Sequence, residues 1–251
     1  MKPANMLAFY RFVADRSPLP VMIYNFPQAT GYDIAAELVI ELAEHSNLIG
    51  VKESSGDVEK VRRMVEGTRH IKRSATVSET FDAITPRMLK SANQQSAELV
   101  SVGALAGTAS SAAGTTPRPA MPSSSAVSVL SGIKTRQKEV GFQVLVGSAQ
   151  KLQPSLDAGA VGAILAFANA APTACYEIYA AWKEGDAELA QLKQQRIVEA
   201  AQRVAGDLGI PGIKYGMDFN GYYGGVPRLP LLPVTADVRA EIERLLSDIR
   251  N

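Results

Sequence analysis

The chain has 251 residues, of which 46% are hydrophobic, and a formal net charge of +1. This length is sufficient for one large α/β domain with a buried core. The near-neutral charge argues against a nucleic-acid-binding protein, and no stretch approaches the roughly 18 consecutive apolar residues of a membrane span. Cys175 is the single cysteine, and with only His45 and His70 beside it there is no disulfide and no zinc or haem ligand set. We therefore expect no metal, no nucleic-acid partner and no membrane partner.

Apolar periodicity in residues 1–70 predicts helices that alternate with strands. Two short apolar runs, Val21–Tyr24 and Leu48–Lys52, are typical of buried strands. Amphipathic helices, the last with Asp57 as its N-cap, are expected at Asn5–Asp15, Ala35–His45 and Val58–Glu66. This order predicts parallel strands joined by crossover helices.

The same alternation returns in residues 141–170, with strands at Phe142–Val146 and Val161–Ala166 around a short helix at Leu152–Leu156. Residues 171–251 read as a helical region. Its helices are expected at Thr173–Trp182, Ala187–Leu208 and Pro211–Phe219, followed by a closing helix that Thr235 caps.

Residues 71–140 differ from both flanking regions in composition. Ser, Ala, Thr and Gly dominate, and Pro117, Pro119 and Pro122 fall within a few residues of one another. Such a segment cannot bury much apolar surface, so we predict a disordered low-complexity insertion.

Lys52 is the first candidate for chemistry, because it ends a predicted buried strand. In parallel α/β barrels the carboxyl ends of the strands form the active face. A lysine amine that emerges there from apolar neighbours can become a nucleophile toward a ketone. The alternative is a strand-end lysine whose ammonium simply reaches solvent.

Tyr24 ends the preceding strand 28 positions earlier, one βα unit away, so the two strand ends should be neighbours. Its phenol is placed to transfer protons while an imine forms at Lys52. An aromatic residue that only covers the end of the sheet is the alternative. Ser54 shares the side of Lys52 by period-two alternation, whereas Glu53 points the other way and is expected to be structural.

Two linked motifs carry a resemblance to a known family. Tyr24-Asn25-Phe26-Pro27 with Thr30-Gly31, and then Gly50-Val51-Lys52 through Gly56-Asp57, resemble the YNxPxxTG and GxKxxxGD signatures of the dihydrodipicolinate synthase/N-acetylneuraminate lyase family of class I, Schiff-base aldolases. Later segments around Gly147 and Ile164 resemble the ends of the seventh and eighth strands of that family's barrel. The tail around Lys214 and Tyr222 looks closest to the 4-hydroxy-2-oxoglutarate aldolase branch.

The resemblance implies a TIM (β/α)8 barrel fold and a lyase that cleaves or forms a carbon–carbon bond in a 2-keto acid of the pyruvate type. It implies Lys52 as the Schiff-base lysine, Tyr24 as its proton-transfer partner, and a substrate pocket lined by Ser54, Gly147, Ser148 and Ile164. No cofactor is needed, and a homo-oligomer in the cytoplasm is expected.

The chain departs from the family in matching only the second half of the barrel, as units five and six in residues 1–70 and units seven and eight in residues 141–170. The Gly-Glu turn that holds the substrate carboxylate in relatives has no counterpart, because no Gly-Glu dipeptide occurs. A catalytically inactive barrel fragment that acts as an interaction module is therefore the alternative function. A mitochondrial location stays open, because the N-terminus looks truncated.

Overall fold

A computed structural model describes residues 2–79 and 134–249, which form two units. One unit comprises Met1–Ser74 with Glu139–Asn251, and the other comprises Ala75–Lys138. Strands β3 (Arg73–Glu79) and β4 (Lys134–Val140) pair as a two-stranded sheet, in which the Gln137 side chain donates to Thr76 Oγ1 at 2.8 Å. The predicted insertion over residues 71–140 is thus not disordered at its two ends, where strand pairing satisfies the backbone. Its remainder, including the three prolines, lies outside the described residues.

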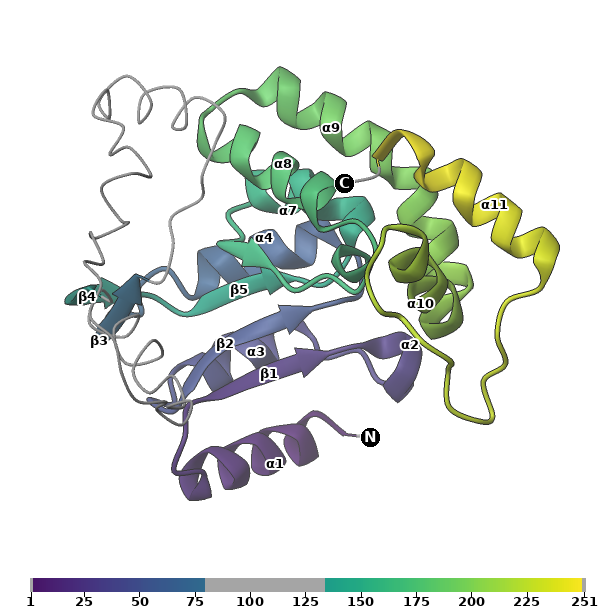
Figure 1. The fold of residues 1–251 in the computed structure, drawn as a ribbon. Helices are drawn as coiled ribbons and strands as arrows, with labels where there is room; N and C mark the ends of the chain where they lie inside the picture. The colour runs from purple at the N-terminus through teal and green to yellow at the C-terminus, as the bar shows by residue number, and fades with distance from the viewer. Residues whose placement is uncertain (1, 80–133, 250–251) are drawn as a thin grey trace, which may run out of the picture. The chain divides into compact units, whose positions relative to one another are not determined.

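The larger unit is built on a parallel sheet in the order β1-β2-β5-β6 (Figure 1). The strands are β1 (Val21–Asn25), β2 (Leu48–Glu53), β5 (Gln143–Val146) and β6 (Gly162–Ala163). All three neighbouring pairs are parallel, so their carboxyl ends meet at one edge. The predicted α/β fold is confirmed, and the strand assignments at β1, β2 and β5 hold to within one residue.

The predicted strand Val161–Ala166 is wrong in length, since only Gly162 and Ala163 form β6. Backbone bonds from Val161 N to Val144 O and from Ile164 N to Val146 O complete its pairing. Because β5 ends at Val146, the chain beyond Ile164 has no strand partner there and turns into the short helix η3 (Phe167–Asn169).

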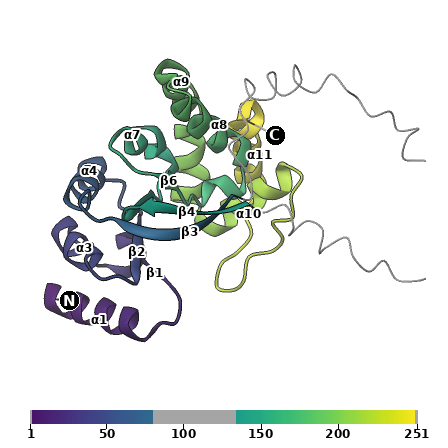
Figure 2. The same cartoon turned by 90° about the vertical axis from the view of Figure 1, so that its left-hand side faces the viewer.

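The first hydrophobic cluster lies between β1, β2 and their helices. The helices that pack there are α1 (Pro3–Arg16), α3 (Ala36–Ala43) and α4 (Val58–Gly67), whereas the short α2 (Pro27–Thr30) buries no residue. Leu42, Val51 and Met64 are fully buried at its centre. The predicted N-cap of α4 is confirmed, because the Asp57 carboxylate accepts from Lys60 N at 3.0 Å. Figure 2 shows α1, α3 and α4 in succession outside the strands.

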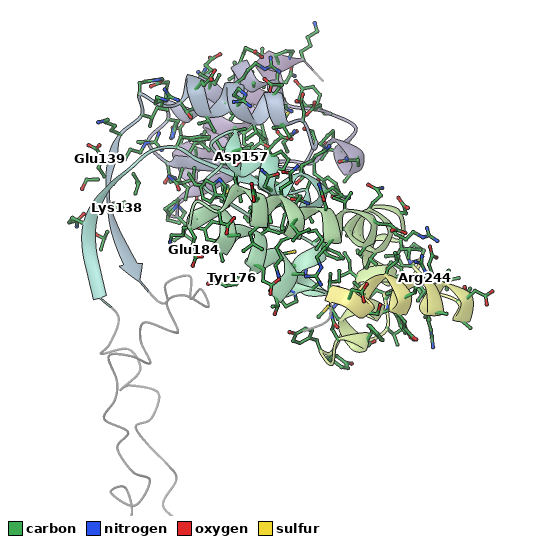
Figure 3. All side chains as sticks on the ribbon, turned by 90° about the horizontal axis from the view of Figure 1, so that it is seen from above. Lys138, Glu139, Asp157, Tyr176, Glu184 and Arg244 are labelled. Carbon is green, nitrogen blue, oxygen red and sulfur yellow. The ribbon has the colours of Figure 1, made fainter. Side chains whose placement is uncertain are left out.

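A second cluster fills the space between β5 and the later helices. These elements are η2 (Ala149–Lys151), α7 (Leu152–Asp157), α8 (Pro172–Lys183) and α9 (Ala187–Ala200). Val146, Leu156 and Ile178 are buried in it, while Tyr176 on α8 marks its outer side in Figure 3.

The C-terminal region is helical, as predicted, but with one change of helix type. The predicted helix Ala187–Leu208 is α-helical only to Ala200 and continues as the π-helix η4 (Ala201–Asp207). The chain ends with α10 (Gly209–Phe219), α11 (Ala236–Leu246) and η5 (Ser247–Ile249). None of the described helices is long and apolar enough to cross a membrane.

Candidate active site

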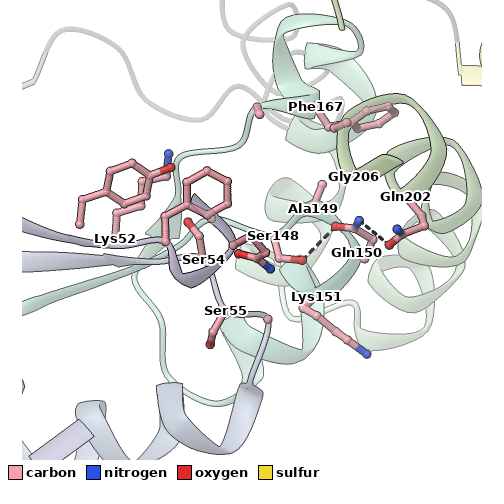
Figure 4. A pocket seen from close by; sticks show the side chains of 17 residues that line it. Lys52, Ser54, Ser55, Ser148, Ala149, Gln150, Lys151, Phe167, Gln202 and Gly206 are labelled. Carbon is pink, nitrogen blue, oxygen red and sulfur yellow. Dashed lines mark hydrogen bonds between the residues drawn. The ribbon is translucent and has the colours of Figure 1, made fainter. Parts of the chain in front are cut away.

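A cavity of about 500 Å³ opens at the carboxyl edge of the parallel sheet. The ends of β1 and β2 form one wall, and the segment after β5 together with η3 and η4 forms the other (Figure 4). The lining includes Tyr24, Phe26, Lys52, Ser54, Gly147, Ser148, Gln150, Lys151, Phe167 and Gln202. Lys52 and Lys151 bring positive charge to it, and no Asp or Glu occurs among its described lining residues.

Lys52 and Tyr24 are neighbours in this cavity, as the sequence predicts. The two residues are paired in the β1–β2 register, and Lys52 Nζ lies 4.3 Å from the centroid of the Tyr24 ring. Phe26 stacks on the same ring, with centroids 5.7 Å apart and planes 11° from parallel. The lysine amine is thus held over an aromatic face at the end of a strand.

Ser54 and Gly147 meet where β2 and β5 end. Ser54 lines the cavity, but its Oγ is buried and has no hydrogen-bond partner among the described residues. Gly147 donates its backbone N–H to Glu53 O at 2.7 Å, and a side chain at position 147 would overlap Ser54. Glycine is therefore required for this close approach of the two strand ends.

Ser148 lies on the opposite wall, at the start of a chain of polar side chains. Its hydroxyl donates to Gln150 Oε1 at 2.9 Å, and Gln150 Nε2 donates to Gln202 Oε1 at 3.1 Å (Figure 4). Gln202 in turn donates to Asp207 Oδ1 at 2.7 Å within the π-helix. Sequence reasoning missed Gln150 and Gln202, because only the tertiary fold brings residues 52 positions apart into contact.

Ile164 is the one predicted pocket residue that does not line this cavity. Its side chain is 44% exposed, and Ala166 and Phe167 of the same segment line the cavity instead. The chain turns toward η3 directly after Ile164, which carries these later residues to the cavity.

The other face of β1 and β2 carries a group of polar residues that we name the ion cluster: Asn25, Asp33, Glu53 and Lys60. Glu53 is 1% exposed, so it points away from Lys52 as predicted. Asn25 Nδ2 donates to both Glu53 oxygens at 2.9 Å, and Lys60 Nζ lies 3.3 Å from Glu53 Oε2. Burial alone would raise the pKa of Asp33, but hydrogen bonds from Lys60 and Asn25 outweigh it and lower that pKa.

The residues described contain no group of three or more His, Cys, Asp or Glu side chains that could hold a metal ion. His45 contacts Asp15, and His70 contacts Glu44.

The sequence is similar to those of several 4-hydroxy-tetrahydrodipicolinate synthases. A 4-hydroxy-tetrahydrodipicolinate synthase of Exiguobacterium sp. is 24% identical over 239 residues, which is 95% of this chain and 58% of the relative. The same enzyme of Stenotrophomonas maltophilia is 47% identical over 62 residues, 25% of this chain and 21% of the relative. The relatives that align along nearly the whole chain, from Exiguobacterium sp. and Natronomonas pharaonis, are covered over only 58% and 61% of their own length.

Solved structures share the fold. One is YagE, a prophage protein of E. coli K12 in complex with pyruvate, with a TM-score of 0.64 and 24% identity over 99% of this chain and 62% of that one. Dihydrodipicolinate synthase of Thermotoga maritima also has a TM-score of 0.64, with 18% identity over 99% and 62% of the two chains. The model of the Dihydrodipicolinate synthetase family matches residues 1–97 and 125–249. The chain therefore belongs to the dihydrodipicolinate synthetase family.

Proposed function

We propose that this chain carries the imine-forming half of a Schiff-base aldolase that acts on a 2-keto acid of the pyruvate type. The observation that carries the proposal is the position of Lys52, whose amine lies over the Tyr24 ring in a cavity at the carboxyl edge of a parallel sheet. Carboxyl ends of strands are where α/β folds place their reactive groups.

The reaction begins when the neutral amine of Lys52 attacks the ketone carbon and a carbinolamine forms. Loss of water from that carbinolamine requires a proton donor, and the Tyr24 phenol is the titratable group beside the amine. The Tyr24 phenolate left by that proton transfer takes the proton of the substrate's 4-hydroxyl group, the adjacent carbon–carbon bond breaks, and the aldehyde fragment leaves. The protonated imine takes up the electron pair of the broken bond and becomes an enamine. Protonation of the enamine and hydrolysis of the imine then release pyruvate and free Lys52.

The rest of the cavity supports a polar, anionic substrate. Lysines without carboxylates in the lining favour a negatively charged ligand. The amide of Gln150 offers hydrogen bonds to hydroxyl or carbonyl groups of the substrate. We infer 4-hydroxy-2-oxoglutarate or a substrate of the dihydrodipicolinate synthase type. YagE, of similar fold, binds pyruvate, which agrees with a keto acid in this cavity.

We further propose that the four parallel strands are units five to eight of a (β/α)8 barrel. The partial coverage of the relatives and the exposure of Tyr24 at 46% and Ile164 at 44% support this assignment, since a closed barrel would cover such side chains. Association with further copies would bury the same surface, in line with a homo-oligomer. Family membership favours the aldolase over an inactive interaction module.

Release of pyruvate from 4-hydroxy-2-oxoglutarate, coupled to lactate dehydrogenase, tests the proposal on the 251-residue chain. The wild type should release pyruvate without added metal, and Lys52→Arg should release none above background. Lys183→Arg, which changes an exposed lysine of α8, is the matched control and should keep the wild-type rate. Equal rates for Lys52→Arg and the wild type would remove Lys52 from the reaction.

A further inference from the structure

The ends of β1 and β2 form two residue pairs that point to opposite faces of the sheet. Tyr24 is in register with Lys52, and Asn25 is in register with Glu53. Because side chains alternate along a strand, the first pair reaches the cavity and the second pair is buried on the other face. Tyr24 is 46% exposed, whereas Asn25 and Glu53 are each 1% exposed.

The side chains of the buried pair contact the loop after β2, the segment before α3, and α4. Glu53 Oε1 accepts from Ser55 N at 2.7 Å in the loop that follows β2. Asn25 Oδ1 accepts from Ile34 N at 3.0 Å, ahead of α3. Lys60, 3% exposed in the first turn of α4, contacts both Glu53 and Asp33. The side chains of the ion cluster therefore join β1, β2, α4 and the segment before α3.

Main-chain bonds from the neighbouring strand ends hold the same two residues. Ser54 N donates to Asn25 O at 2.9 Å, and Gly147 N donates to Glu53 O at 2.7 Å. The residues that directly follow Tyr24 and Lys52 are thus held through both their side chains and their carbonyls. A displacement of either residue would move the adjacent member of the cavity pair.

Stability alone is a poor explanation for this arrangement. Desolvation of a carboxylate and an ammonium is costly, and replacement of such a pair by neutral groups of similar size often leaves stability unchanged. What ionic and amide groups supply is directional contact, which restricts the relative position of the strands more narrowly than apolar packing does.

We propose that Asn25, Glu53 and Lys60 are positioning residues that hold the Tyr24 phenol and the Lys52 amine in the arrangement needed for imine formation. The inference rests on the proposed function, because it assigns these residues to the same reaction. The cluster acts through the backbone of β1 and β2 and touches no substrate.

The test compares two neutralised ion pairs in the 251-residue chain. Glu53→Gln with Lys60→Met removes the two buried charges of the cluster at once, so no buried charge is left without its partner. Asp33 loses its ion pair with Lys60, but its side chain is 53% exposed. Glu177→Gln with Lys193→Met does the same to a Lys–Glu pair between α8 and α9, 2.6 Å apart and outside the cavity. Each protein is incubated with a series of pyruvate concentrations and borohydride, and the rate of adduct formation at Lys52 is measured by peptide mass spectrometry.

The cluster variant should keep its thermal midpoint within a few degrees of the wild type, while its limiting trapping rate falls at least about tenfold. Its half-saturating pyruvate concentration should change less than about twofold, because the groups that bind pyruvate are untouched. The control pair should match the wild type in both constants. A folded cluster variant with the wild-type limiting rate would overturn the inference.

Two further measurements cover the cases in which the double variant does not fold or the wild type gives no adduct. If the double variant does not fold, Glu53→Asp keeps the charge but withdraws the carboxylate from Asn25 and Lys60; it should slow trapping in the same way, and a wild-type rate would overturn the inference. If the wild type itself gives no adduct, the proposed function fails instead. The positioning role is then tested by pulse acetylation, in which the rate at Lys52 is divided by the rate at Lys183. This ratio should change at least about threefold in the double variant, or in Glu53→Asp if only that variant folds. An unchanged ratio would refute positioning.

Discussion

The two hydrophobic clusters of the larger unit differ in the polar groups that they bury. The first cluster, beneath β1 and β2, adjoins the buried charges of Glu53 and Lys60. The second, around β5 and the later helices, includes the neutral Gln194, which accepts from Gln153 N at 2.8 Å and donates to Ala149 O at 3.0 Å. Both groups support a wall of the same cavity.

This difference follows the chemistry of the two walls. The β1–β2 wall presents the Lys52 amine and the Tyr24 phenol, whose relative position decides whether the imine that we propose can form. The opposite wall presents Ser148 and Gln150, which can bind the substrate and shape the cavity. The charged groups of Glu53 and Lys60 thus lie behind the β1–β2 wall, which we call the reactive wall. The amide of Gln194 lies behind the opposite wall, which we call the binding wall.

The largest effect is expected at the reactive wall itself. Tyr24→Phe keeps the ring that stacks on Phe26 but removes the proton-transfer group. Turnover should fall by about two to four orders of magnitude, the usual contribution of a positioned acid or base. Some imine trapping at Lys52 should remain. Steady-state pyruvate release checks this, and wild-type turnover would remove Tyr24 from the mechanism.

The next largest effect is expected for the reactivity of Cys175, which is buried in the second cluster. Burial raises the pKa of this thiol from 9.0 to about 12. Since only the thiolate reacts, modification by a disulfide reagent at pH 8 should be about a thousandfold slower in the folded chain than in guanidinium.

The same pKa shift gives a pH dependence of stability. From pH 9 upward the unfolded thiol loses its proton while the folded one keeps it to about pH 12. The free energy of unfolding should therefore decline over that range, and Cys175→Ala should lessen the decline. Urea unfolding of the two chains at pH 8 and pH 10.5 measures the difference. An equal decline in both would show that Cys175 is not shielded from water.

The buried polar groups behind the two walls can be compared by removing one hydrogen-bonding or ion-pairing side chain from each. Lys60→Met leaves the Glu53 carboxylate buried without its cation and should lower the free energy of unfolding by about 3–5 kcal/mol. Gln194→Leu leaves a backbone donor and acceptor unpaired and should cost about 1–3 kcal/mol. Urea unfolding of both variants at pH 7 gives the ranking, and a larger cost for Gln194→Leu would contradict the comparison.

An effect as small as that of Gln194→Leu is expected where the two walls approach each other. Gly147→Ala forces a methyl group into Ser54 and should destabilise the chain by about 1–3 kcal/mol. Gly162→Ala in β6 is the control, because its methyl group would meet Leu145 at an ordinary 3.4 Å. Thermal melts of the two variants should separate clearly. Equal midpoints would mean that the strand ends at Gly147 are loosely packed.

Much of the reactive wall could be predicted from the sequence, because local rules determine it. Strand alternation placed Lys52 and Ser54 on one side and Glu53 on the other, and one βα unit of spacing placed Tyr24 beside Lys52. The burial of Lys60 could not be predicted in this way, since lysine is almost always exposed unless a partner distant in sequence neutralises it.

The binding wall was harder to predict, because long-range contacts build it. Gln150 meets Gln202 only after β5 and η4 have packed. The π-helix that carries Gln202 has no signal in a pattern of apolar residues, which reads as one continuous α-helix from Ala187 to Leu208. The shortness of β6 has a similar origin, since it depends on where β5 ends.

The claim that Lys52 forms an imine with a keto acid is tested most directly by reductive trapping. The 251-residue chain is incubated with pyruvate and borohydride, digested, and mapped by mass spectrometry, with Lys52→Arg in parallel. Trapping needs only the amine and its proton donor, so it does not depend on complete turnover. We predict one reduced pyruvate adduct, on Lys52, and none in Lys52→Arg. An adduct on Lys60, Lys214 or another lysine, with Lys52 unmodified, would contradict the account.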